Sequence, residues 1–268
     1  MTQQFDIIVL GDSEDGKRAV KALATASNTL NIAFISKYFR TSTTRDYLNV
    51  DYVKDEVLFT DYKNRLFCCY LASGRRFYCT HLIIATGLSY KPYTVNGRIV
   101  PNVYNNATDI SKQAKKLPAV VIGDSNEDIK LALAISKKFK QVYLCTQTMQ
   151  LNGTPSNVNK LMNRPNIVVL HTTSVNKVHC KHGTLESVDL DNYSSITCSA
   201  IFIKTESSPE VKAIPEKLIS RTDTNHLITS SNCESKLVPK CFAIGNCASR
   251  FTKTMFNNMI SNILNDFI

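Results

Sequence analysis

The sequence has no tryptophan, no Cys-x-x-Cys pair and no long apolar run. A helix needs about 20 consecutive apolar residues to cross a bilayer, so the lack of such a run excludes a transmembrane helix. The start of the chain carries no basic segment ahead of an apolar stretch, which argues against a signal peptide. We therefore expect a cytoplasmic protein that makes no membrane contact.

The nine cysteines fit neither a redox pair nor a metal site. No cysteine and histidine spacing is typical of zinc ligands, and an odd number of cysteines in a chain without a leader favours reduced thiols. Cys68 and Cys69 are adjacent in a predicted strand, where neighbouring side chains point to opposite faces, so they make a poor dithiol. We predict no metal site and no redox dithiol.

The basic residues are numerous but dispersed. Lysine and arginine total 32 against 22 acidic residues, which gives a formal net charge of +10. They occur as short pairs such as Arg75-Arg76, whereas a nucleic-acid-binding element concentrates them on one face with aromatic residues between. The pattern indicates a solvated basic surface and no nucleic-acid partner.

Two similar strand–helix–strand segments are visible. An apolar run at 5–10 ends at Gly11, small apolar residues then recur at helical spacing to about residue 25, and 31–35 is a second apolar run. The pattern returns at 119–122, which ends at Gly123, with a helix to about 139 and a strand at 141–145. Each segment has the size of a nucleotide-binding βαβ unit.

Strand-like text fills the remaining chain. Predicted strands at 57–60, 66–70 and 77–79 lead to Leu82-Ile-Ile-Ala-Thr-Gly87, and a hairpin is predicted around Lys181-His-Gly183. The chain then reads Cys241-Phe-Ala-Ile-Gly-Asn246 and ends in a predicted helix from about Lys253.

The order of these signatures resembles the flavoprotein reductases that include thioredoxin reductase. The carrying motifs are Ala85-Thr-Gly87, Val120-Val-Ile-Gly123 and Phe242-Ala-Ile-Gly-Asn246. The resemblance implies an α/β fold of two Rossmann-like dinucleotide-binding domains, the second inserted into the first. Residues 1–108 and 210–268 would form the FAD-binding-like domain and 109–209 the NAD(P)-binding-like domain. It also implies a homodimer that acts on a redox protein or a small-molecule substrate.

The first turn keeps part of the family's glycine pattern. Glycines there permit a tight turn and a close approach of backbone to pyrophosphate. Ser13 replaces the middle glycine, and Asp12, Glu14 and Asp15 place negative charge where a helix N-terminus would hold an anion. Ser36 stands where the family has its ribose-binding acid, and Asn246 where it has an aspartate. The predicted cofactor-binding residues are Gly11, Ser13, Gly16, Ser36, Lys37, Thr86, Gly87, Gly245 and Asn246.

The second turn departs further from the family. Ser125-Asn-Glu-Asp128 is the pattern of a capping box, in which a helix satisfies its own first N–H groups. Relatives that use NADPH place arginines after the next strand, whereas this chain reads Cys145-Thr-Gln-Thr-Met-Gln150. The sequence argues against NADPH and, less strongly, against NADH.

Two hypotheses for function remain open, and neither names a catalytic residue. The first is an FAD-dependent oxidoreductase that lacks a dithiol and draws electrons from a source other than NADPH. The second is a non-catalytic descendant that keeps the scaffold for binding or assembly, since a fold does not fix a function.

Overall fold

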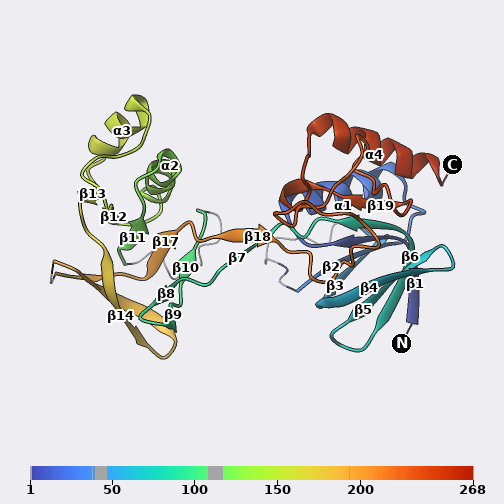
Figure 1. Ribbon diagram of the computed structural model, residues 1–268, viewed down its shortest axis with the longest axis horizontal. Coiled ribbons are helices and arrows are strands. Elements are labelled where there is room, and N and C mark those ends of the chain that lie inside the picture. Colours follow the sequence, from blue (N-terminus) through green and yellow to red (C-terminus); the bar gives the residue numbers. More distant parts are fainter. Residues whose placement is uncertain (1, 38, 40–46, 108–116, 193, 268) are drawn as a thin grey trace. The chain divides into compact units, whose positions relative to one another are not determined.

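A computed structural model describes residues 2–37, 39, 47–107, 117–192 and 194–267. The chain divides into two compact units, shown in Figure 1. Unit 1 comprises Met1–Ser89 and Ser207–Ile268, and unit 2 comprises Tyr90–Glu206. Among the described residues, no helix is both long and apolar enough to cross a bilayer.

Unit 1 is built on a seven-stranded sheet in the order β3-β2-β1-β6-β5-β4, with β19 also paired to β6. Strands β1, β2, β3, β6 and β19 run parallel, and β4 and β5 form an antiparallel hairpin on β6. The strands are β1 (Thr2–Leu10), β2 (Ile32–Ser36), β3 (Val50–Lys54), β4 (Val57–Lys63), β5 (Leu66–Leu71), β6 (Arg76–Ile84) and β19 (Cys241–Ala243).

Both faces of this sheet are covered. Ile7, Ile8 and Val9 of β1 are all fully buried, as expected of a central parallel strand that is covered on both sides. Helices α1 (Glu14–Ala26) and α4 (Lys253–Asn265) lie together over one face (Figure 1) and share an apolar cluster with β1 and β2. Apolar side chains from residues 211–238 pack into the cluster on the other face.

Unit 2 contains a parallel five-stranded sheet in the order β10-β17-β11-β12-β13 and a three-stranded antiparallel sheet, β14-β15-β16. Its helices within the described part of the chain are α2 (Asn126–Ile135) and α3 (Pro155–Met162). The strands are β10 (Val103–Tyr104), β11 (Ala119–Ile122), β12 (Val142–Cys145), β13 (Ile167–Leu170), β14 (Val175–Lys181), β15 (Thr184–Leu190), β16 (Ser195–Thr197) and β17 (Ala200–Ile203).

Short elements complete the chain. Strands β7 (Leu88–Tyr90) and β18 (Ser207–Pro209) pair with each other, as do β8 (Thr94–Val95) and β9 (Arg98–Ile99). A 3₁₀ turn, η2 (Gly245–Cys247), follows β19 directly.

The predicted α/β fold with two parallel-sheet units is confirmed, and β19 joins the same sheet as β1. The predicted hairpin is β14–β15, and its turn residues His182 and Gly183 both have positive φ, 50° and 75°. Helix α2 ends at Ile135, earlier than expected, because Ser136 caps it and donates its hydroxyl to the carbonyl of Leu133. Helix α3 was not predicted from the sequence.

Candidate functional site

The turn after β1 admits only glycine at two positions. Gly11 has a φ of +95°, and a Cβ built there would lie 2.5 Å from the carbonyl oxygen of Ala85. A Cβ on Gly16 would lie 2.3 Å from the carbonyl oxygen of Gly11. Both contacts are far inside van der Waals distance, so the crossing of this turn over the end of β6 requires both glycines.

Three strand ends meet beside this turn. Strands β1, β6 and β19 are neighbouring and parallel, so the residues that follow them gather at one edge of the sheet. Gly87 and Gly245 follow β6 and β19 with φ values of +70° and +72°. A Cβ on Gly245 would lie 2.8 Å from Oδ2 of Asp15, so the first turn of α1 packs onto this residue. Of the predicted residues, the structure brings together Gly11, Gly16, Gly87 and Gly245.

The start of α1 is capped by Ser13. Its Oγ accepts a hydrogen bond from the N–H of Gly16 at 3.1 Å. The two acids that follow are each paired one turn on, since Lys17 lies 3.3 Å from Glu14 and Arg18 lies 3.0 Å from Asp15. These cations offset part of the negative charge that the sequence places at this turn.

A carboxylate from the first turn lies at the end of β2. Ser36 ends β2, and its Oγ donates to Oδ1 of Asp12 at 3.0 Å. Lys37 instead pairs with Glu56 at 2.7 Å. Sequence reasoning took Asp12 only as a charge that repels phosphate, because the direction of its side chain cannot be read from the motif.

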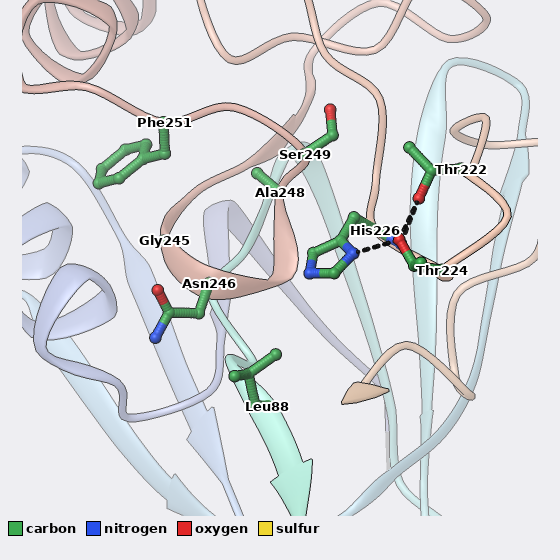
Figure 2. Close-up of a pocket in the computed structure, with 9 residues that line it drawn as sticks. All are labelled: Leu88, Thr222, Thr224, His226, Gly245, Asn246, Ala248, Ser249 and Phe251. Carbon is green, nitrogen blue, oxygen red and sulfur yellow. Dashed lines mark hydrogen bonds between the residues drawn. The ribbon is translucent and has the colours of Figure 1, made fainter. Parts of the chain in front are cut away.

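Unit 1 also contains a cavity of about 510 Å³, bordered by Gly245 and Asn246 and shown in Figure 2. Thr222, Thr224 and His226 lie on its other side. His226 Nδ1 is 2.9 Å from Thr224 Oγ1, and the His226 N–H donates to Thr222 Oγ1 at 3.1 Å, so the imidazole is held in place. Sequence reasoning missed these three residues, whose only signal is a Thr-x-Thr-x-His spacing in turn-like text.

Thr86 places a buried hydroxyl beside the thiol of Cys247, and the two side chains interact. Burial raises the pKa of the Cys247 thiol, which therefore stays protonated and shares its hydrogen between the carbonyls of Ile244 (3.2 Å) and Ile84 (3.5 Å). A ligand at this strand end could accept a hydrogen bond from the Thr86 hydroxyl in place of that contact.

The predicted capping box at α2 is confirmed. The Ser125 N–H donates to Oδ2 of Asp128 at 3.1 Å, and the Asp128 N–H donates to Ser125 Oγ at 3.3 Å. Asp128 is 7% exposed. A Cβ on Gly123 would lie 2.3 Å from the same carboxylate oxygen, so the carboxylate fills the space directly above this glycine.

Hydrogen bonds hold the segment after β12 against the start of α2. Thr148 Oγ1 donates to Oδ2 of Asp124 at 2.8 Å, and the Asn152 N–H donates to the Asp124 carbonyl at 2.8 Å. The Thr154 N–H donates to Oδ1 of Asn126 at 3.0 Å. The polar groups at the N-terminal end of α2 are thus engaged in hydrogen bonds within the chain.

Among the described residues, no group of three or more cysteine, histidine or acidic side chains could hold a metal ion. All nine cysteines are free, and Cys180 alone is exposed. Burial raises the pKa of Cys145 and of Cys241 to about 12, which keeps both thiols protonated.

The pyridine nucleotide-disulphide oxidoreductase family profile matches residues 8–261. The chain belongs to this family. Its fold is similar to that of thioredoxin reductase from Lactococcus lactis, with a TM-score of 0.70 at 14% identity over 98% of both chains. It is also similar to the T. acidophilum enzyme (TM-score 0.70, 15% identity, 97% of both chains). The Streptococcus pyogenes enzyme gives 0.60 at 15% identity over 98% of this chain and 99% of that one. No curated protein matches.

Proposed function

We propose that unit 1 binds FAD and that the protein is a flavin-dependent oxidoreductase without a redox dithiol. The carrying observation is the meeting of Gly11, Gly87 and Gly245 at one sheet edge beside the buried hydroxyl of Thr86. Backbone that approaches this closely, with left-handed glycines and a hydroxyl donor beside them, suits a bound pyrophosphate.

Different residues of unit 1 are proposed to contact the phosphate, the ribose and the ribityl chain of FAD. Ser13 accepts from Gly16 but keeps its own hydroxyl hydrogen, which can donate to a phosphate oxygen. Asp12, with Ser36, offers a carboxylate to the adenosine ribose. Asn246, on the cavity of about 510 Å³, is the proposed contact to the ribityl chain. FAD would supply the redox chemistry, and the chain binds and orients it.

We propose further that the electrons come from a donor other than NADPH. The Asp128 carboxylate lies over Gly123, and the segment after β12 is tied to Asp124 and Asn126. Residues 146–150 contain no cation for a 2′-phosphate. A dinucleotide would have to displace these groups and would meet a negative charge in their place.

A non-catalytic scaffold is the second candidate, and one observation favours it. The carboxylate of Asp15 packs against Gly245, and its Oδ2 lies 2.8 Å from where a Cβ on that glycine would be. This side chain reduces the space proposed for the pyrophosphate. If FAD cannot move this side chain aside, the fold serves binding or assembly alone.

Titration with FAD separates the two candidates. We expect saturable quenching of flavin fluorescence and a dissociation constant of about 1 μM or tighter. The bound flavin should be reduced by dithionite and should not be reduced by NADPH. If refolding with excess FAD at micromolar protein leaves no bound flavin, the oxidoreductase proposal fails and the scaffold reading takes its place.

The family resemblance also supports a homodimer that acts on a redox protein or a small-molecule substrate. Light scattering coupled to size-exclusion chromatography measures the molar mass directly. A mass of one chain at micromolar concentration would remove the dimer from this proposal and leave flavin binding to be judged by its own titration.

A further inference from the structure

A second concave region lies wholly within unit 2. Helices α2 and α3 enclose a groove of about 650 Å³, called here the basic groove. Its cations are Lys130, Lys137, Lys160 and Arg164, and its apolar floor is Leu133 and Ala134. Three asparagines of α3 and its C-terminal cap complete it. No residue that lines it is acidic.

The cations stand on both sides of the groove. Lys130 lies on α2, and Lys137 lies in the turn that follows its end at Ile135. Lys160 lies in the last turn of α3, and Arg164 follows the C-terminal cap of that helix, Asn163. Lys130 pairs with Glu127 at 2.8 Å, whereas Lys137, Lys160 and Arg164 form no salt bridge with any described residue. Positive charge is therefore left uncompensated inside a concavity, where it acts most strongly on an anion.

Arg164 is held in a fixed orientation. It is half-buried, and its Nε donates to Ser136 Oγ at 3.2 Å. Ser136 is buried and is itself bonded to the carbonyl of Leu133, so the guanidinium is tied to the end of α2. A guanidinium fixed through Nε can still present its other N–H groups as a fork to a carboxylate.

We propose that the basic groove docks an acidic segment of a partner protein. The amide side chains and the apolar floor suit a polypeptide. The groove is lined by no aromatic side chain on which nucleic-acid bases could stack. A partner segment rich in acidic residues complements the four cations of the groove. This inference goes beyond the proposed function and does not depend on flavin.

The probe is a fluorescein-labelled peptide of about twelve residues in which glutamate and alanine alternate. Its binding is measured by fluorescence anisotropy at low and at physiological salt. We expect the pair Lys137→Glu and Lys160→Glu to weaken binding by about tenfold or more. Arg164→Lys, which keeps the charge and loses the fork, should weaken it about threefold.

The matched control is the pair Lys177→Glu and Lys181→Glu, two exposed lysines of β14 outside the groove. It changes the net charge by the same amount, and we expect less than a twofold effect. Equal weakening by both pairs would overturn the proposal, as would no peptide binding by the parent protein at low salt. An oligothymidine of similar length that bound as tightly and needed the same lysines would overturn it in favour of nucleic acid. Thermal melts confirm that each variant is folded.

Discussion

At the scale of single residues, comparing Gly11 with Gly74 distinguishes the cost of backbone strain from the cost of steric overlap. Gly11 and Gly74 both have positive φ, +95° and +81°, but a Cβ on Gly74 would meet nothing within 4 Å. We expect Gly74→Ala to lower the free energy of unfolding by about 1 kcal/mol, through backbone strain alone. Gly11→Ala should lower it by about 2–4 kcal/mol, since strain and overpacking add, and should release flavin. Urea unfolding measures both.

Equal losses for the two variants would mean that the first turn yields to an added methyl group. The close contact between Gly11 and Ala85 would then not constrain the site. In that case flavin titration of Gly11→Ala should match that of the parent protein.

Asp12 is expected to contribute to affinity for FAD but not for FMN, because FMN lacks the adenosine. Losing a charge-assisted hydrogen bond of about 1.5 kcal/mol should weaken FAD binding about tenfold in Asp12→Asn. Glu14→Gln removes the same charge two residues further along the chain and should leave FAD affinity within about twofold. Both ligands are titrated by fluorescence quenching. A parallel loss for FMN would exclude a role at the ribose.

The residues of the site were only partly accessible to sequence reasoning. Gly11, Gly16 and Gly245 could be predicted because a position that admits only glycine can be recognised directly in the sequence. Asp12 could not, because its role depends on which way its carboxylate points. His226 lies in turn-like text, and only the folded cavity shows that it faces Asn246 across an open space.

At the scale of elements, the proposal that unit 2 does not bind NADPH rests on the start of α2. We expect no calorimetric signal from the parent protein with NADPH or NADH. Asp128→Gly should gain measurable NADH affinity and lose about 1 kcal/mol of stability with its cap. Asp128→Asn keeps the volume above Gly123 and should gain none. A dissociation constant below about 50 μM for NADPH in the parent protein would contradict the proposal.

The end of α4 is held by a buried histidine. His81 Nε2 lies 2.9 Å from Oδ2 of Asp266, and its Nδ1 lies 2.9 Å from Thr80 Oγ1. Burial lowers the pKa of His81, although the bond to Asp266 opposes this shift. The hydrogen bonds from His81 and Lys240 lower the pKa of Asp266.

Both pKa values are lower in the folded protein than in the unfolded chain, so the unfolded chain binds more protons as the pH falls. Both shifts therefore destabilise the folded protein in acid. Stability should begin to fall as the pH drops below about 6.5, the ordinary pKa of histidine, and should fall again near the ordinary aspartate pKa of about 3.9. In His81→Gln the first decline should be smaller. Urea midpoints between about pH 7.5 and 5.5 test this, and an unchanged slope in the variant would assign the decline to other groups.

Element prediction succeeded where a turn signal closes an apolar run or joins two strands. The apolar runs of β1 and β11, each ending at a glycine, and the hairpin at His182-Gly183 carry strong local signals. Helix α3 was missed because it is only eight residues long, and because its start, Thr154 followed by Pro155, resembles a loop when read alone. Cap chemistry, rather than hydrophobic pattern, marks such a short helix.

At the scale of the whole molecule, thiol chemistry should be confined to one position. Eight cysteines are buried and Cys180 is exposed on β14. We expect one rapidly reacting thiol with an aromatic disulfide reagent in the native protein, none in Cys180→Ser, and nine after denaturation. Two fast thiols that persist in Cys180→Ser would reveal a reactive pair and reopen the question of a dithiol.

The order of motifs along the chain was sufficient to predict the fold, because each motif marks a strand end that the parallel sheets then align. It was not sufficient for the site. Substituted positions such as Ser36 and Asp128 depart from the family pattern in the sequence itself, whereas the contact between Asp12 and Ser36 appears only when distant segments are brought together.

The Asp128 carboxylate over Gly123 can be treated as an intramolecular competitor for its own helix end. A ligand tethered by a few residues has an effective concentration of millimolar or more. An outside anion present at micromolar levels would therefore be at a disadvantage of about a thousandfold before any contact of its own is counted. The proposed barrier to NADPH binding in unit 2 is thus one of mass action. It would persist after arginines were added for the 2′-phosphate, unless the tethered competitor were removed first.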